Sequence, residues 1–178
     1  LVAPVSAGGA FNTAVIDPKL EYVYMNEGKD SETCLIMKHK TTGDFYLFRA
    51  DLTKTEPVAV ACENLGSLTD MSEAEQFAFG IRGNVLFYAT DTKVYAWRYG
   101  KEEAVECMTV GTGERISQIK IYNNPSDNAM TGKVLFVATQ KGDEGKVYKA
   151  VFNEMSGLFQ EKPLEYTGFR LIRDMFYK

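Results

Sequence analysis

The stretch Asn84-Val-Leu-Phe-Tyr-Ala-Thr-Asp-Thr-Lys-Val-Tyr-Ala-Trp-Arg-Tyr-Gly100 decides the fold, because it holds two apolar runs on either side of the dipeptide Asp91-Thr92. Both runs are rich in β-branched and aromatic residues, which favour strands. Two such runs joined by two polar residues are typical of a β-hairpin. We therefore predict a hairpin over residues 84–100.

Two further copies of this hairpin are visible in the chain. Residues 85–90 match residues 134–139 at an offset of 49, and residues 93–95 match residues 146–148 at an offset of 53. The earlier copy spans residues 34–39 and 44–50. The turns within the three copies are predicted to hold four, two and six residues, which is how a repeated hairpin varies.

Each hairpin is flanked by further strand-like runs, and four antiparallel strands about every 50 residues are typical of β-propeller blades. We expect an all-β, propeller-like single domain over residues 1–178, in which residues 69–76 could form one helical turn. The predicted parts are an entry arm (1–17), blades over 18–66, 67–112 and 113–168, and a final strand over 169–178.

Three blades and a final strand do not close a ring, since propellers typically have at least four blades. An open blade face would expose apolar surface and invite association. We therefore expect either a part of a larger propeller or self-association through open blade faces. Because the sequence begins at Leu1 without Met, we also expect a processed protein or a piece of a longer one.

Composition excludes some classes of protein. The 178 residues are 45% hydrophobic and 25% charged, with a net charge of −4, and no run of basic residues suits a phosphate backbone, so nucleic acid is not an expected partner. No apolar run approaches the roughly 20 residues of a transmembrane helix. Cys34, Cys62 and Cys107 are expected to be small buried hydrophobes, although one disulfide bridge is left open.

The repeats also resemble a known family. Residues 132–139, the aromatic-rich run 146–152 and the ending 168–178 are similar to the C-terminal propeller-like region of the PKD-like family of Bacteroidetes envelope proteins, over about residues 30–178. Those proteins are generally lipoproteins, so the resemblance implies an exported, envelope-associated binding or scaffold protein. Residues 87–97 also have the rhythm of quinoprotein-type blades, which we interpret as shared architecture without the cofactor.

Candidate catalytic groups are sparse. His39 is the single histidine, which excludes paired-histidine metal sites and favours a surface or turn-packing role. Paired carboxylates are the remaining route to hydrolysis, and the candidates beside predicted first strands are Asp70, Glu73, Glu114 and Asp174. Asp143 and Glu144 are expected to serve a hairpin turn. We predict no catalytic residue, no metal and no cofactor.

The expected function is therefore non-enzymatic binding of a protein or glycan partner. Candidates for binding residues are the aromatic groups that could stack on sugars and the polar residues of the longest loop: Trp97, Tyr99, Tyr122, Asn123, Asn124 and Asp127. Two alternatives stay open, a carbohydrate-active enzyme with carboxylates on channel loops, and a purely structural segment that completes a larger propeller.

Overall fold

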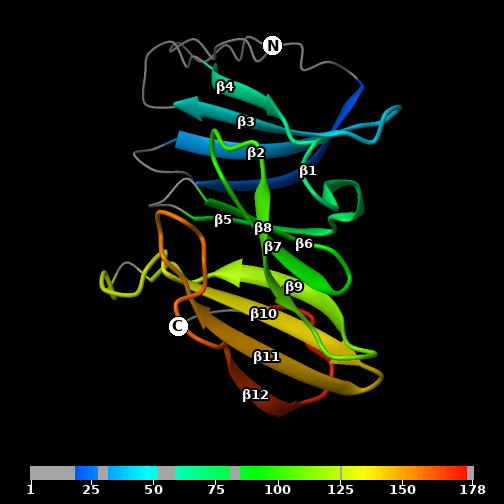
Figure 1. Ribbon diagram of the computed structural model, residues 1–178, viewed down its shortest axis with the longest axis vertical. Helices are drawn as coiled ribbons and strands as arrows, with labels where there is room; N and C mark the ends of the chain where they lie inside the picture. The colour runs from blue at the N-terminus through cyan, green and yellow to red at the C-terminus, as the bar shows by residue number, and fades with distance from the viewer. Residues whose placement is uncertain (1–18, 28–31, 52–58, 81–84, 125, 176–178) are drawn as a thin grey trace, which may run out of the picture. The chain divides into compact units, whose positions relative to one another are not determined.

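The computed structural model describes residues 19–27, 32–51, 59–80, 85–124 and 126–175, and it confirms the all-β class (Figure 1). Apart from a 3₁₀ turn over Met71–Glu73, the regular elements of these residues are strands. They are β1 Leu20–Glu27, β2 Glu32–His39, β3 Phe45–Asp51, β4 Ala59–Asn64, β5 Gln76–Gly80, β6 Val85–Ala89, β7 Lys93–Arg98, β8 Ala104–Thr109, β9 Arg115–Ile121, β10 Val134–Lys141, β11 Glu144–Val151 and β12 Leu164–Phe169.

The strands form three four-stranded antiparallel sheets in which neighbours in the chain are neighbours in the sheet. We name them sheet A (β1–β4), sheet B (β5–β8) and sheet C (β9–β12). The chain divides into two compact units, residues 1–72 with sheet A and residues 73–178 with sheets B and C, and each is described by itself. The single domain expected from the sequence stays a prediction.

Strand register supports the alignment of the repeats. In sheet B, Tyr95 lies opposite Glu106, and in sheet C the equivalent Tyr148 lies opposite Glu165. In sheet A the equivalent Tyr46 lies opposite Asn64. The three sheets are therefore copies of one unit and resemble propeller blades.

One predicted turn is wrong. The six-residue turn expected over residues 140–145 is a two-residue turn, because Lys141 pairs with Glu144 and Gln140 with Gly145. Gly142 has a φ of +57° at the first central position, where a type II′ hairpin turn requires a residue that tolerates positive φ. The strands β10 and β11 are correspondingly longer than the sequence alignment predicts.

The core of the second unit lies between sheets B and C. β6 contributes Val85, Phe87 and Ala89 from one side, and β10 contributes Leu135 and Val137 from the other. Phe87 meets Phe152 edge-to-face with ring centroids 4.7 Å apart. Because side chains alternate along a strand, the opposite side of sheet C carries Phe136, Val147 and Lys149, and we call it the far face.

The predicted final strand over residues 169–178 is wrong where the structure describes it. β12 ends at Phe169, and residues 170–175 have no strand structure. Instead they return across the far face towards β9, where Lys120 Nζ donates to the backbone carbonyl of Met175 at 2.6 Å (Figure 1, red). Side chains thus provide the hydrogen bonds of this segment, in place of the backbone ladder that a strand would form. Residues 176–178 and the entry arm over residues 1–17 lie outside the described residues.

Candidate functional site

The carboxylate of Glu114, on the turn between β8 and β9, is the centre of a buried polar network. Its residue is 6% exposed, and three side chains from sheet C donate to it. Thr139 Oγ1 lies 3.1 Å from Oε2, Tyr148 Oη 2.9 Å from Oε2, and Lys146 Nζ 2.7 Å from Oε1. Lys146 also lies 3.1 Å from Glu165 Oε1 on β12. We call these five residues the Glu114 network.

The network fixes the charges of its members. Burial of the Glu114 carboxyl raises its pKa, but the hydrogen bonds from Lys146, Tyr148 and Thr139 and the charge of Lys146 outweigh this effect, so the pKa is lowered. Hydrogen bonds to Glu114 and Glu165 raise the pKa of Lys146. Burial, followed by the hydrogen bond to Glu114, raises the pKa of Tyr148. Lys146 therefore stays protonated between two carboxylates, which makes it a poor nucleophile or base.

Sheet B contains part of the same arrangement. Lys93, equivalent to Lys146, lies 3.2 Å from Glu106, which is equivalent to Glu165. Sheet A has Asp44 and Asn64 at these positions. Since the Lys–Glu pair occupies equivalent positions in two of the three sheets, we interpret the Glu114 network primarily as a stabilising feature of the blade-like unit.

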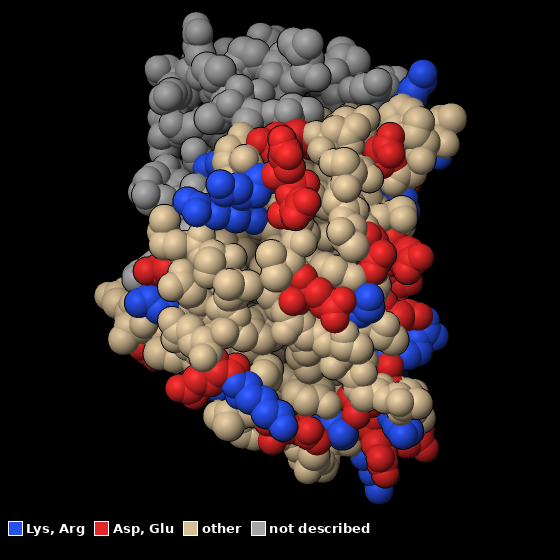
Figure 2. Space-filling model, viewed as in Figure 1, with Lys and Arg blue, Asp and Glu red and all other residues tan. Residues whose placement is uncertain are grey.

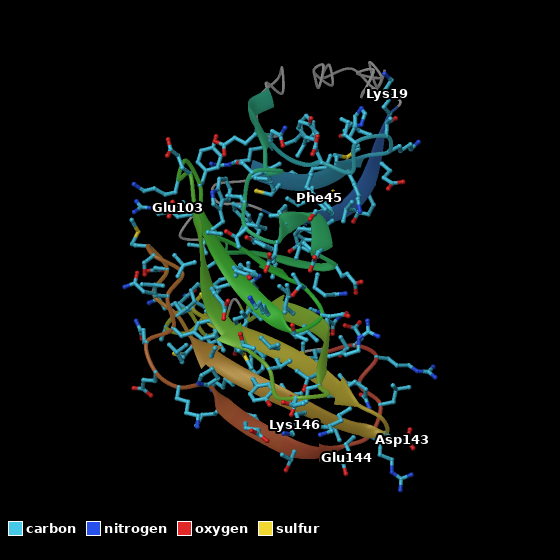
Figure 3. All side chains as sticks on the ribbon, turned by 45° about the vertical axis from the view of Figure 1, so that its right-hand side comes forward. Lys19, Phe45, Glu103, Asp143, Glu144 and Lys146 are labelled. Atoms are coloured by element: carbon cyan, nitrogen blue, oxygen red, sulfur yellow. The ribbon has the colours of Figure 1, made fainter. Side chains whose placement is uncertain are left out.

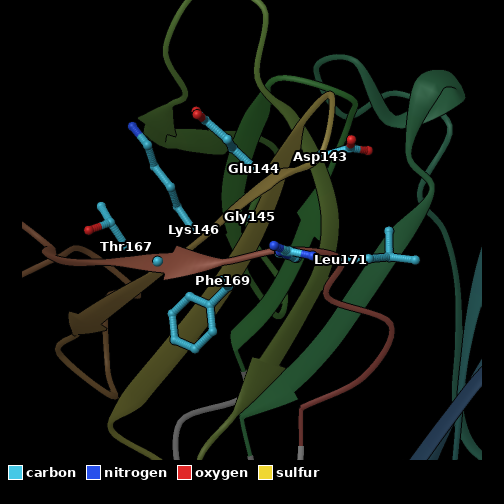
Figure 4. A pocket seen from close by; sticks show the side chains of 9 residues that line it. Asp143, Glu144, Gly145, Lys146, Thr167, Phe169 and Leu171 are labelled. Atoms are coloured by element: carbon cyan, nitrogen blue, oxygen red, sulfur yellow. The ribbon is translucent and has the colours of Figure 1, made fainter.

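A cavity of about 830 Å³ adjoins the network and is lined by residues of the β10–β11 hairpin and of residues 167–171. Figure 3 places Asp143, Glu144 and Lys146 at the same end of this hairpin. In Figure 4 the lining side chains diverge: Lys146 and Glu144 project to one side of β12 and Phe169 to the other. The polar groups do not converge on one point, as a ligand or catalytic site would require.

We predict that Glu114→Gln lowers the free energy of unfolding by about 1 to 3 kcal/mol at pH 7, because a buried charged acceptor loses its charge. The folded pKa of Glu114 is lowered, so its stabilisation is present above the ordinary pKa of 4.5 and is lost as the pH falls through the folded value. Urea unfolding of both proteins at about pH 7, 5, 4 and 3 should therefore give free energies of unfolding that converge in acid.

Glu106→Gln is the control for this prediction, because the Glu106 side chain is 44% exposed in its pair with Lys93. An exposed pair contributes about 0 to 1 kcal/mol, so we expect little change at any pH. If the difference in the free energy of unfolding between the wild type and Glu114→Gln stays constant down to pH 3, the result contradicts a lowered pKa of Glu114.

The aromatic candidates of β7 lie in different environments. Trp97 is 2% exposed, its Nε1 donates to the carbonyl of Lys101 at 2.7 Å, and its indole is part of the interior. Tyr99 is half-buried and meets Trp97 edge-to-face at 5.8 Å. An exposed stacking platform for sugars would need open ring faces, which Trp97 does not offer.

The polar candidates of the longest loop lie close together, and their hydrogen bonds are mainly to one another. Asn124 Nδ2 donates to Tyr122 Oη at 3.1 Å, and Tyr122 Oη lies 3.5 Å from Asp127 Oδ2. Thr131 Oγ1 donates to the carbonyls of Asn124 and Asp127. Asn123 has a buried side-chain oxygen without a hydrogen-bond partner among the described residues. The loop is a compact, internally bonded structure.

The candidate carboxylates do not form a catalytic pair. Glu114 belongs to its network, whereas Asp174 accepts from Gln118 Nε2 at 2.8 Å and lies 3.5 Å from Lys120. Asp70 adopts a left-handed backbone conformation with a φ of +53°, and Glu73 is exposed on the 3₁₀ turn. Asp143 and Glu144 are exposed at the β10–β11 turn, as the sequence predicts.

His39 serves a turn. Its Nδ1 accepts from the backbone N–H of Thr42 at 3.1 Å and lies 3.2 Å from Thr42 Oγ1. Cys34 and Cys107 are free thiols, Cys34 buried and Cys107 half-buried, and burial raises the pKa of Cys107 to about 11. The side chain of Cys62 lies outside the described residues.

Metal ligands, membrane-spanning helices and surface charge do not indicate a further site among the described residues. Within the described ranges, no three His, Cys, Asp or Glu side chains are grouped so as to hold a metal ion. No helix in the same part of the chain has the length and apolar character to cross a membrane. On the face shown in Figure 2, acidic and basic side chains are interspersed.

Sequence reasoning found Glu114 as a candidate carboxylate but missed its partners Thr139, Lys146 and Tyr148. A signal for them was present, because Thr90, Lys93 and Tyr95 occupy the aligned positions of the preceding repeat. Their approach to Glu114 depends on strand pairing, which a single sequence does not specify.

The fold defines a class, an all-β protein of repeated four-stranded sheets that resemble propeller blades. Solved structures that are similar to it include "Structure of a Post-proline cleaving enzyme from Rickettsia typhi", with a TM-score of 0.53 at 9% sequence identity. The match covers 84% of this chain and 23% of that one, so the chain spans about a quarter of its length. At this identity the likeness shows the fold alone. No family model and no curated protein matches the sequence.

Proposed function

We propose that this chain is a non-enzymatic binding or scaffold module made of propeller-type blades, and that it recognises a protein partner through the far face of sheet C. One observation carries the proposal. Phe87, Val94 and Ala96 of sheet B are buried on the side that forms the core with sheet C, whereas their equivalents Phe136, Val147 and Lys149 are partly exposed on the far face.

Other side chains extend this apolar surface. Leu164 and Tyr166 lie opposite Lys149 and Val147, so they occupy the same face, and they are 61% and 45% exposed. Phe169, opposite Gly145, is also 45% exposed. Contiguous exposed apolar groups of this kind mark protein interfaces more often than sugar sites, which are built from a few stacking rings and hydrogen bonds.

The proposed biological setting rests on the family resemblance alone. The similarity of residues 132–139, 146–152 and 168–178 to envelope proteins of the PKD-like family of Bacteroidetes supports an exported protein at the cell envelope or outer surface. Fractionation of cells that make the full-length protein, with detection in the cytosol alone, would overturn this location.

A partial propeller that is completed by further blades is the second candidate. It is favoured by residues 170–175, which lead from β12 at one edge of sheet C to β9 at the other edge, as a connection to a following blade would do. In this case the far face packs against another sheet. A glycan-degrading enzyme has less support, because Glu114 and Asp174 lie in separate networks.

Selection against two libraries tests the proposed function. Wild-type protein is immobilised to select from a random peptide phage library, and it is applied in solution to a glycan array. Both experiments are repeated with the Leu164→Ser/Tyr166→Ser variant. We expect enriched peptides that bind the variant about tenfold more weakly, a loss of about 1.4 kcal/mol.

Two results would overturn the proposal. Glycan binding that survives the double substitution and is lost in Tyr122→Ala/Asn124→Ala would favour the glycan alternative. Release of reducing sugar from a polysaccharide panel, lost on changing one carboxylate, would establish an enzyme.

A further inference from the structure

A second cavity lies on the far face itself, between β10, β11 and residues 170–175, which we call the returning segment. Its volume is about 440 Å³, within the range of pockets that bind ligands. Phe136, Val147 and Phe169 provide aromatic and aliphatic lining, and Ile172 adds to it from the returning segment. We call this cavity the far-face groove.

The groove is held open by bonds at both ends of residues 170–175. At one end, Gln140 Nε2 donates to the carbonyl of Arg170 at 3.1 Å. At the other end, Lys120 Nζ donates to the carbonyl of Met175 and Gln118 donates to Asp174. A site formed by anchored side chains needs little ordering when a ligand binds, which reduces the entropic cost of association.

Charge around the groove is mainly positive. Arg170 and Arg173 line it and are exposed, and the described residues offer neither of them an ion pair. Lys149, on the same face, occupies the position that Ala96 has in sheet B and Leu47 has in sheet A. Asp174, the carboxylate among the lining residues, is already bound to Gln118 and Lys120. A negatively charged ligand would therefore complement this surface.

We propose that the far-face groove binds an acidic, apolar polypeptide segment of a partner protein. Its large apolar side chains lie against Phe136, Val147 and Phe169, and its carboxylates pair with Arg170 and Arg173. Arg forks bind carboxylates with two parallel hydrogen bonds, which makes them suited to this role. The inference rests on the proposed function, because it names the chemistry of the partner that the far face recognises.

Two synthetic peptides test the inference. Both are nine residues long and fluorescein-labelled, and in the middle of both an apolar residue, leucine or tyrosine, alternates with threonine. One peptide has two aspartates at each end, and the other has two lysines at each end. Fluorescence anisotropy is expected to show about tenfold tighter binding of the acidic peptide, weakened when NaCl is raised from about 50 to about 300 mM.

Arg170→Gln/Arg173→Gln should lower the affinity for the acidic peptide about tenfold and abolish the preference between the peptides. Arg98→Gln, which changes an exposed arginine at the end of β7, is the matched control and should leave both affinities unchanged. Circular dichroism of each variant checks that the fold is retained.

The outcomes separate the inference from the proposed function. Equal binding of both peptides that is lost in Leu164→Ser/Tyr166→Ser would overturn the acidic preference and leave protein recognition by the far face intact. Absence of binding by either peptide would overturn the groove as a peptide site, while the library selection decides the proposed function independently.

Discussion

Phe87→Ala is expected to lower the free energy of unfolding of the second unit by about 3 to 5 kcal/mol, the range for removing a buried phenylalanine. Phe87 is fully buried in the core between sheets B and C and packs edge-to-face on Phe152. Its removal leaves a cavity that the surrounding strands cannot fill, because their backbones are fixed by ladder bonds on both sides. Urea unfolding followed by the fluorescence of Trp97, the single tryptophan, measures the loss.

Phe136→Ala is the matched control, since Phe136 occupies the equivalent position of sheet C. It is half-buried on the far face, so the same chemical change should cost roughly 1 to 2 kcal/mol from lost apolar burial. Equal losses at the two positions would show that the far face is as tightly packed as the core, and would contradict its assignment as a binding surface.

Gly157→Ala is expected to destabilise by about 2 to 4 kcal/mol, because two costs combine. The backbone of Gly157 has a φ of +77°, which disfavours any residue with a Cβ. A Cβ here would also lie 2.8 Å from Ala96 Cβ and 2.8 Å from Val85 Cγ1. The β11–β12 connection could then no longer lie against sheet B.

Gly100→Ala separates these two costs. Gly100 has a φ of +76°, and a Cβ would meet nothing within 4 Å, so only the backbone cost of about 1 kcal/mol is expected. Similar losses for both variants in urea unfolding would mean that the connection moves away freely, contrary to close packing at Gly157.

The repeat was predictable from the sequence because matching residues occur at equivalent positions of the copies. Val85 and Val134, and Tyr95 and Tyr148, align by counting, and the structure pairs them equivalently in their sheets. The length of the last hairpin was not predictable by alignment, since the extra residues extend the ladder to the Lys141–Glu144 pair instead of enlarging the turn.

The candidate site was less predictable, for a physical reason. Glu114 lies 25 residues from Thr139 and 32 from Lys146 along the chain, and only the approach of the β8–β9 turn to sheet C joins them. The far-face groove depends likewise on where residues 170–175 run. A strand was expected there because the segment is apolar and aromatic, yet its polar contacts are made by side chains of Gln140, Gln118 and Lys120.

The anchoring of the returning segment has a practical consequence for handling the protein. Since Lys120 holds the carbonyl of Met175 beside β9, anything fused after Lys178 begins only three residues away from that anchor. A bulky C-terminal fusion would shield the far-face groove and depress apparent affinities, whereas a small dye at this end would sense occupancy of the groove.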